Sequence, residues 1–170
     1  DPGYFFPDFP GALSGKLDAS GERDAQGHWK GGARLAGLRG SLRKRPVQGQ
    51  ARVQFAADSA NGELSLRIGN SHVEAGGRYG EQLDLHAQFS PLDLADLWPG
   101  ASGRLQGRMA VRGARIAPAY EADLRGEGLR WGQFAARQLS ARGRLPASGR
   151  NGDLQLSAKD LSLSGQTFDS

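Results

Sequence analysis

Apolar and polar residues alternate along most of this 170-residue chain. In residues 47–55, Val, Gly, Ala and Phe occupy every second position, while Gln and Arg fill the positions between them. A period of two is typical of a β-strand with one dry face and one wet face. Because the pattern recurs along the chain, we expect about ten strands in a largely antiparallel, all-β protein.

The pattern of apolar and polar residues also occurs twice in the chain, as an internal repeat. Tyr120, Ala122 and Leu124 align with Trp29, Gly31 and Ala33 when 91 is subtracted from each number, and the similarity extends over residues 118–145 and 27–53. Repeats of several strands each are typical of arrays that share one continuous sheet. We therefore expect copy one over about residues 10–98 and an incomplete copy two over about 99–170, in a fragment of a longer array.

A single short helix is predicted over residues 91–98. Ser90 can cap it, Pro91 suits the first helical position, and Leu94, Leu97 and Trp98 share one side. Such a helix is too short to cover a sheet, so we expect it to plug or lid one edge. Its acidic residues, Asp93 and Asp96, are interpreted as solubilising the helix.

Several shorter motifs predict local structure. Asn61-Gly62 indicates a hairpin turn, and Gly126-Glu127-Gly128 a bend within strands. The basic segment Arg43 to Pro46 is interpreted as a solvated turn, with contact to a phosphate or lipid headgroup as the alternative. The aromatic and proline-rich residues 1–11 are expected to cap the first strand.

The composition indicates that nothing in this chain covers the apolar side of the predicted sheet. Only 38% of residues are apolar, 26 are glycine, and the helices that usually cover such a face are missing. Two halves could close as a sandwich, the sheet could close as a filled barrel, or it could curl into an open trough. The repeat favours the trough, since copies added end to end would lengthen it, and the glycines favour strong curvature.

Candidate chemistry is sparse. The three histidines, His28, His72 and His86, fall at solvent-facing strand positions and have no metal-ligand spacing. There is no cysteine, no nucleotide-binding glycine motif, and a net charge of only +4. We expect no catalytic residues, no cofactor, no metal site, no nucleic-acid partner and no membrane span in this fragment.

The alternation predicts which residues face the interior of the trough. An exposed apolar surface of this size is typical of a binding face, and a long apolar ligand would fit it. The predicted lining residues are Leu13, Leu17, Trp29, Leu35, Val47, Val53, Phe55, Leu64, Leu66, Ile68, Leu83, Leu85, Phe89, Leu105, Met109, Val111, Tyr120, Leu124, Leu139, Leu145, Leu154 and Leu156. Lys16, Arg52, Arg67 and Arg108 are predicted to face outward.

Residues 92–107, reading Leu-Asp-Leu-Ala-Asp-Leu-Trp-Pro-Gly-Ala-Ser-Gly-Arg-Leu-Gln-Gly, together with Gly113, Pro118 and the Leu-Arg-Trp-Gly of residues 129–132, resemble the TamB family of translocation and assembly module subunits and its AsmA-like relatives. The resemblance covers both copies and is weaker in the first. It implies a β-taco, a long sheet folded lengthwise around a hydrophobic groove, in a periplasmic protein with an inner-membrane anchor outside this fragment. It also implies phospholipid passage to the outer membrane, and an outer-membrane TamA-type barrel as partner in the assembly of β-barrel proteins.

The function expected is therefore a non-enzymatic groove segment that binds phospholipid acyl chains. The alternative is a chaperone-like module that binds unfolded β-strand clients by strand addition. A third interpretation is a closed β-sandwich adhesin or scaffold. Because the first and last strands of a fragment lack partners, we also expect end-to-end self-association.

Overall fold

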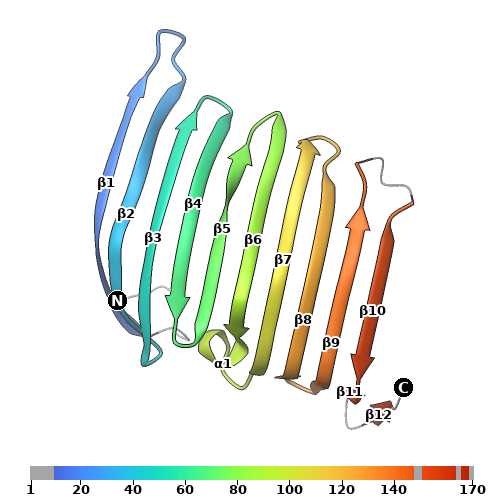
Figure 1. The fold of residues 1–170 in the computed structure, drawn as a ribbon. Helices are drawn as coiled ribbons and strands as arrows, with labels where there is room; N and C mark the ends of the chain where they lie inside the picture. The colour runs from blue at the N-terminus through green and yellow to red at the C-terminus, as the bar shows by residue number, and fades with distance from the viewer. Residues whose placement is uncertain (1–9, 148–150, 164–165, 169–170) are drawn as a thin grey trace.

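The computed structural model describes residues 10–147, 151–163 and 166–168. They form one antiparallel sheet in which successive strands are neighbours from β1 to β9, followed by β11 and β12, while β10 also pairs with β9 (Figure 1). The strands are β1 Gly11–Arg23, β2 Trp29–Leu42, β3 Arg45–Ala56, β4 Ser59–Ile68, β5 Ser71–Tyr79, β6 Gln82–Asp93, β7 Ser102–Ala114, β8 Ala119–Trp131, β9 Phe134–Leu145, β10 Asp153–Lys159, β11 Leu161–Leu163 and β12 Gln166–Phe168.

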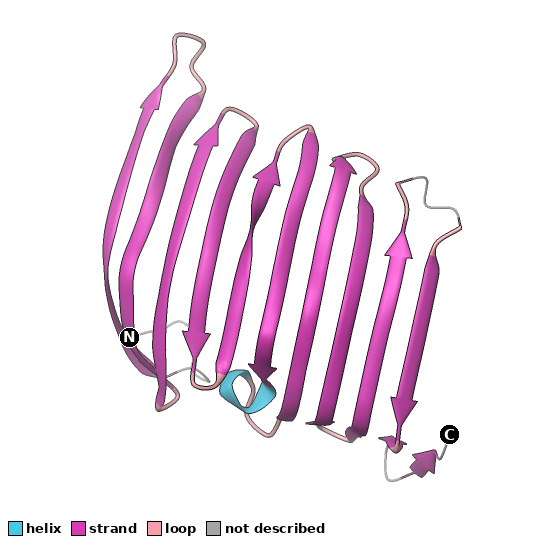
Figure 2. Cartoon of the chain, viewed as in Figure 1, coloured by secondary structure: helices cyan, strands magenta, loops and turns pink. Residues whose placement is uncertain are grey.

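The sheet does not close on itself, because β1 pairs only with β2 within the described part of the chain. Figure 2 shows one layer of strands, with the helix at one end of it. The predicted all-β fold, an open antiparallel sheet with one short helix, is confirmed, and the closed sandwich is wrong. The predicted capping segment falls mostly on residues 1–9, which lie outside the described residues.

Turn chemistry explains some hairpins and not others. Arg43 and Lys44 have φ of 50° and 63° between β2 and β3, which is the two-residue turn whose twist matches a hairpin. The turn predicted at Asn61-Gly62 is wrong, since both residues lie inside β4 and the chain turns at Ala57, with φ of 48°. β3 and β4 pair without interruption from Val47 and Ile68 to Ala56 and Ser59, and this long ladder outweighs the local preference of Asn-Gly for a turn.

The helix is shorter than predicted. α1 spans Leu94–Leu97, and its N-cap is Asp93, whose carboxylate accepts a 3.1 Å hydrogen bond from the Ala95 N–H. Ser90 and Pro91 are part of β6 and are joined by a cis peptide bond, so their predicted roles as cap and first helical residue are wrong.

Bulges let strands bend without losing the face on which their apolar residues lie, and two of them occur at glycines. β2 runs unbroken from Trp29 to Leu42, and its register shifts between Leu35 and Leu38. Gly37, at φ of 59°, absorbs the extra residue. Gly128 has φ of 60° beside the register shift of β7 and β8, so the predicted bend at residues 126–128 is confirmed.

Buried side chains concentrate at the end of the sheet that carries α1. The buried hydrophobic residues, all near the turns at that end, include Val47, Ile68, Leu92, Leu129 and Ala136. The end has a small core, whereas the remainder of the sheet has two largely exposed faces.

Candidate binding face

The strand register collects the predicted lining residues on one face, called here the apolar face. Directly paired residues in antiparallel strands point to the same side. One row crosses the whole sheet from β1 to β10 in this way: Leu17, Leu35, Ala51, Leu64, Ala75, Ala87, Met109, Ala122, Gly143 and Leu154. Neighbouring rows place the other predicted residues beside it, from Val53 and Leu85 to Leu66 and Leu124.

Most of this face is uncovered. Leu17 is 67% exposed at the edge of the sheet, and Met109 is still 44% exposed at its centre. A hollow of about 420 Å³ lies over Val53, Leu64 and Leu85 and is bounded by apolar atoms. Of the predicted lining residues only Val47 and Ile68 are buried, because they belong to the small core beside α1.

Glycines keep the apolar face low in relief. Gly126 pairs with Leu139 and has the side chain of Leu129 lying over it, so that a Cβ added to Gly126 would stand 2.5 Å from Leu129 Cδ1. At Gly49 an added Cβ would stand 3.0 Å from Leu66 Cδ1. Leucine side chains therefore lie along the sheet over neighbouring glycines, which makes a smooth apolar floor.

The opposite face is charged. Arg142 donates to Asp123 across the β8–β9 pair at 2.9 Å, and Arg112 to Asp84 at 3.3 Å. Lys16, Arg52, Arg67 and Arg108 lie on this face as predicted. His86 also lies there, exposed, while His72 is half-buried and near Glu74 at 3.5 Å.

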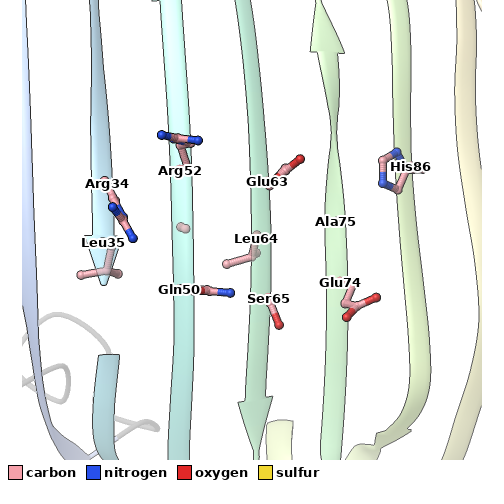
Figure 3. A pocket seen from close by; sticks show the side chains of 11 residues that line it. Arg34, Leu35, Gln50, Arg52, Glu63, Leu64, Ser65, Glu74, Ala75 and His86 are labelled. Carbon is pink, nitrogen blue, oxygen red and sulfur yellow. The ribbon is translucent and has the colours of Figure 1, made fainter. Parts of the chain in front are cut away.

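A second hollow, of about 400 Å³, lies on the charged face (Figure 3). Arg34 and Arg52 are direct cross-strand partners at its border, and Glu63 pairs with Arg52 on the next strand. The sticks in Figure 3 come from successive strands and do not converge on one point. The hollow is more enclosed than that on the apolar face, but its walls are solvated side chains of both signs, so we assign it no ligand.

One polar cluster was missed by the sequence analysis. Asp96 is 0% exposed and accepts hydrogen bonds at 2.8 Å from the Asn70 N–H, 3.1 Å from the Ser71 N–H and 2.9 Å from Ser71 Oγ. Arg45 Nε lies 3.2 Å from its other oxygen. The interpretation of Asp96 as a solubilising residue is wrong, because its carboxylate ties α1 to two turns.

The position of Ser71 shows where α1 lies. Val47, Ile68 and Ser71 form one row of the apolar face. The Ser71 hydroxyl donates to Asp96 of α1 and accepts a hydrogen bond from the Asp93 N–H at 2.9 Å. α1 therefore covers that end of the apolar face (Figure 1). In the sequence this contact is indicated by Ser71, a polar residue at a position of β5 that points to the apolar face.

The described residues include neither a candidate metal site nor a helix that could span a membrane. No three of their His, Asp and Glu side chains gather closely enough to hold a metal ion. None of their helices has the length and apolar character needed to cross a membrane.

Comparison with known proteins gives the chain its family. The family model described as TamB, N-terminal domain, matches residues 1–170. The chain is 28% identical over 165 residues to a translocation and assembly module subunit TamB from Haemophilus influenzae, covering 95% of this chain and 13% of that protein. No solved structure matches it. Its sheet, its uncovered apolar face and the match along its whole length agree: the chain belongs to the TamB N-terminal domain family.

Proposed function

We propose that the apolar face binds the acyl chains of phospholipids and serves as a segment of a lipid groove. The observation that carries the proposal is the row of apolar residues that crosses the sheet from Leu17 to Leu154, in which every residue is exposed or half-buried and none is buried. Burying one leucine fully stabilises by about 1.5–3 kcal/mol, so each half-exposed leucine leaves about 1 kcal/mol to be gained on contact with an apolar ligand.

The low relief of the face supports an acyl chain over a folded partner. A protein interface core usually presents anchor residues that fill pockets. Here leucines lie flat over glycines such as Gly49 and Gly126, which suits a flexible chain that can lie in more than one position. No catalytic role is needed for such a segment, and we propose none.

The setting of the whole protein is part of the same proposal. The chain spans 13% of the Haemophilus influenzae relative, which is named as a subunit of a translocation and assembly module. We propose that the parent protein is an envelope protein with an inner-membrane anchor and a periplasmic groove. It would pass phospholipid toward the outer membrane, support outer-membrane protein assembly, or do both, with a TamA-type barrel as partner.

A charge placed on the apolar face tests the proposal. Val53→Arg puts a cation in the path of an acyl chain, and because Val53 is 39% exposed the new guanidinium can reach water without unfolding the sheet. We expect the variant to melt near the wild-type temperature and to lose most of its co-purifying phospholipid. The same result is expected for Leu124→Arg. Native mass spectrometry of gently purified protein measures the bound lipid.

The matched control is Gln54→Arg, which adds the same charge one residue away on the charged face. It should retain lipid like the wild type, as should Arg52→Leu. Wild-type protein that carries no phospholipid, or a Val53→Arg variant that stays folded and holds as much lipid as Gln54→Arg, would refute the groove. Binding of an unfolded β-strand client with no effect of Val53→Arg would favour strand addition instead.

A further inference from the structure

Carboxylates lie opposite most arginines of the charged face. Directly paired residues on neighbouring strands point to the same side of the sheet, so an arginine and its partner are within reach of each other. The pairs of this kind include Arg34 and Asp18, Arg52 and Glu63, Arg78 and Asp84, Arg108 and Asp123, Arg112 and Asp84, Arg142 and Asp123, and Arg144 and Glu121. The register therefore sets negative charge against positive charge over most of this face.

One row of the charged face departs from this arrangement, and we call it the basic row. Its members, each paired with the next from β2 to β5, are Arg39, Gln48, Arg67 and His72. The partner of Arg39 on β1 is Ser14, so neither arginine of the row has a carboxylate opposite it. Arg125 and Arg130 of β8 also lack one, but within the described residues no second arginine shares a row with either of them. The basic row therefore combines two arginines that the register leaves unbalanced.

A hollow of about 620 Å³ lies over the basic row. Its other polar lining residues are Gln50, Ser65 and Glu74. Glu74 is the one carboxylate in this lining, and it lies 3.5 Å from Nε2 of His72. Neither Arg39 nor Arg67 forms an ion pair with a described residue, in contrast to Arg142, which pairs with its cross-strand carboxylate at 2.9 Å. The hollow is therefore rich in donors whose charge the protein itself does not neutralise.

The spacing of the two arginines suits one small anion. β2 and β4 both pair with β3, so the backbones at Arg39 and Arg67 lie about 10 Å apart. Both long side chains can reach a point above Gln48, which lies between them. A Cβ built on Gly37 would stand 3.8 Å from Nη2 of Arg39, so this guanidinium lies beside the bulge of β2. Bulges of this kind re-aim side chains and are common beside functional sites.

The geometry points to the basic row as a binding site for a phosphate group carried on a small polar molecule. The guanidinium groups of Arg39 and Arg67 each present two parallel N–H donors to phosphate oxygens, and such charge-assisted bonds are about twice as strong as neutral ones. The Gln48 amide donates between them, while Gln50 and Ser65 can bond hydroxyl groups of the ligand. A soluble sugar phosphate and a phospholipid headgroup share this chemistry. The site lies on the face opposite the proposed lipid groove and does not depend on it.

The test has one assay for each source of the phosphate. Isothermal titration calorimetry with glucose 6-phosphate, beside uncharged glucose, measures the soluble source, and co-sedimentation with vesicles of phosphatidylglycerol and phosphatidylcholine measures the headgroup. The variant of the site is Arg39→Gln with Arg67→Gln. The matched control, Arg34→Gln with Arg52→Gln, removes the same charge from the same face. In the assay that detects binding, we expect the variant of the site to bind at least about tenfold more weakly than wild type, a change of about 1.4 kcal/mol. The control should bind as wild type does.

The outcomes decide both the site and its source. A loss confined to calorimetry assigns a soluble phosphate ester, a loss confined to vesicles assigns a lipid headgroup, and a loss in both assays assigns the site to either. Wild-type protein that binds in neither assay overturns the site, as does an equal loss in the control or equal binding of uncharged glucose. Val53→Arg on the apolar face should leave glucose 6-phosphate binding unchanged, so failure of the groove and failure of this site are separate results. Melting curves check folding, and if the double variant unfolds, the single variant Arg67→Gln carries the same comparison.

Discussion

At the scale of single residues, the fully buried carboxylate of Asp96 joins three segments at the end of the sheet that α1 covers. Asp96 of α1 accepts from the β4–β5 turn through Asn70 and Ser71, and it pairs with Arg45 at the start of β3. Removing a charge from water costs several kcal/mol unless donors replace the water. The donors of Asn70 and Ser71 replace it at Oδ2, while Oδ1 has the charge of Arg45 Nε at 3.2 Å. Gly69 is required beside them, because its φ is 57° and a Cβ there would collide with the carboxylate.

Replacing Asp96 with Ala should therefore destabilise the protein. The donors of Asn70 and Ser71 would be left buried without an acceptor, which costs about 1–3 kcal/mol in free energy of unfolding. Asp96→Asn keeps an acceptor oxygen and should lose less. Urea unfolding followed by circular dichroism gives the midpoints.

Asp58→Ala, in the exposed β3–β4 turn, is the control, and its change should stay within about 0.5 kcal/mol. If Asp96→Ala unfolds at the same urea concentration as Asp58→Ala, the cluster does not hold the helix in place.

At the scale of the strand, each element carries two chemistries on opposite sides. β6 presents Leu83, Leu85 and Ala87 to the apolar face and Asp84 and His86 to the charged face. The paired strands keep this division across the sheet because a register slip of one residue would exchange all of them. Since no described residue covers Leu85 fully, a ligand bound on the apolar face would lower the accessibility of that face and not of the charged face.

This difference can be measured with single cysteines, since the chain has none of its own. Leu85→Cys should react with a maleimide in lipid-free protein and become several-fold slower with phospholipid bound, because acyl chains would exclude the reagent. His86→Cys, the next residue on the charged face, should react at the same rate with and without lipid. Equal protection at both positions would show that the ligand does not lie on the apolar face.

At the scale of the whole molecule, the sheet is open and its strands follow one another in chain order. β1 is exposed along nearly its whole length and has β2 as its one partner within the described residues. Unpaired strand edges are templates for pairing with another chain. In the parent protein such an edge would be available for a preceding strand, which agrees with the proposed repeat array.

The isolated fragment should therefore self-associate end to end. Leu17→Lys adds a charge on the edge strand and should lower the sedimentation-detected dimer fraction at high protein concentration, because an inward-pointing charge opposes strand pairing. Met109→Lys makes the same change at the centre of the apolar face and should leave the dimer unaffected. If Met109→Lys abolishes the dimer and Leu17→Lys does not, the copies associate through their apolar faces.

The alternation of residues predicted which face of the sheet each side chain joins, but it did not predict where the chain turns. Alternation alone predicted that Leu17, Val53 and Leu124 share a face opposite Arg52, because the period of a strand is set by backbone geometry. It misplaced the turn at Asn61-Gly62, since ladder pairing over a whole strand outweighs the preference of two residues.

What the sequence by itself determined was the all-β fold, the two faces and the lack of helical cover, all of which follow from the order of apolar and polar residues. Only the tertiary structure decided that Asp96 is buried, that α1 covers one end, and that Arg23 and Arg115 stack on rings at the other. Asp96 and Arg45, like Tyr79 and Arg115, lie far apart in the chain, and their contacts depend on which turns the register brings together. Periodicity fixes the side to which a residue points, whereas pairing and bulges fix its neighbours.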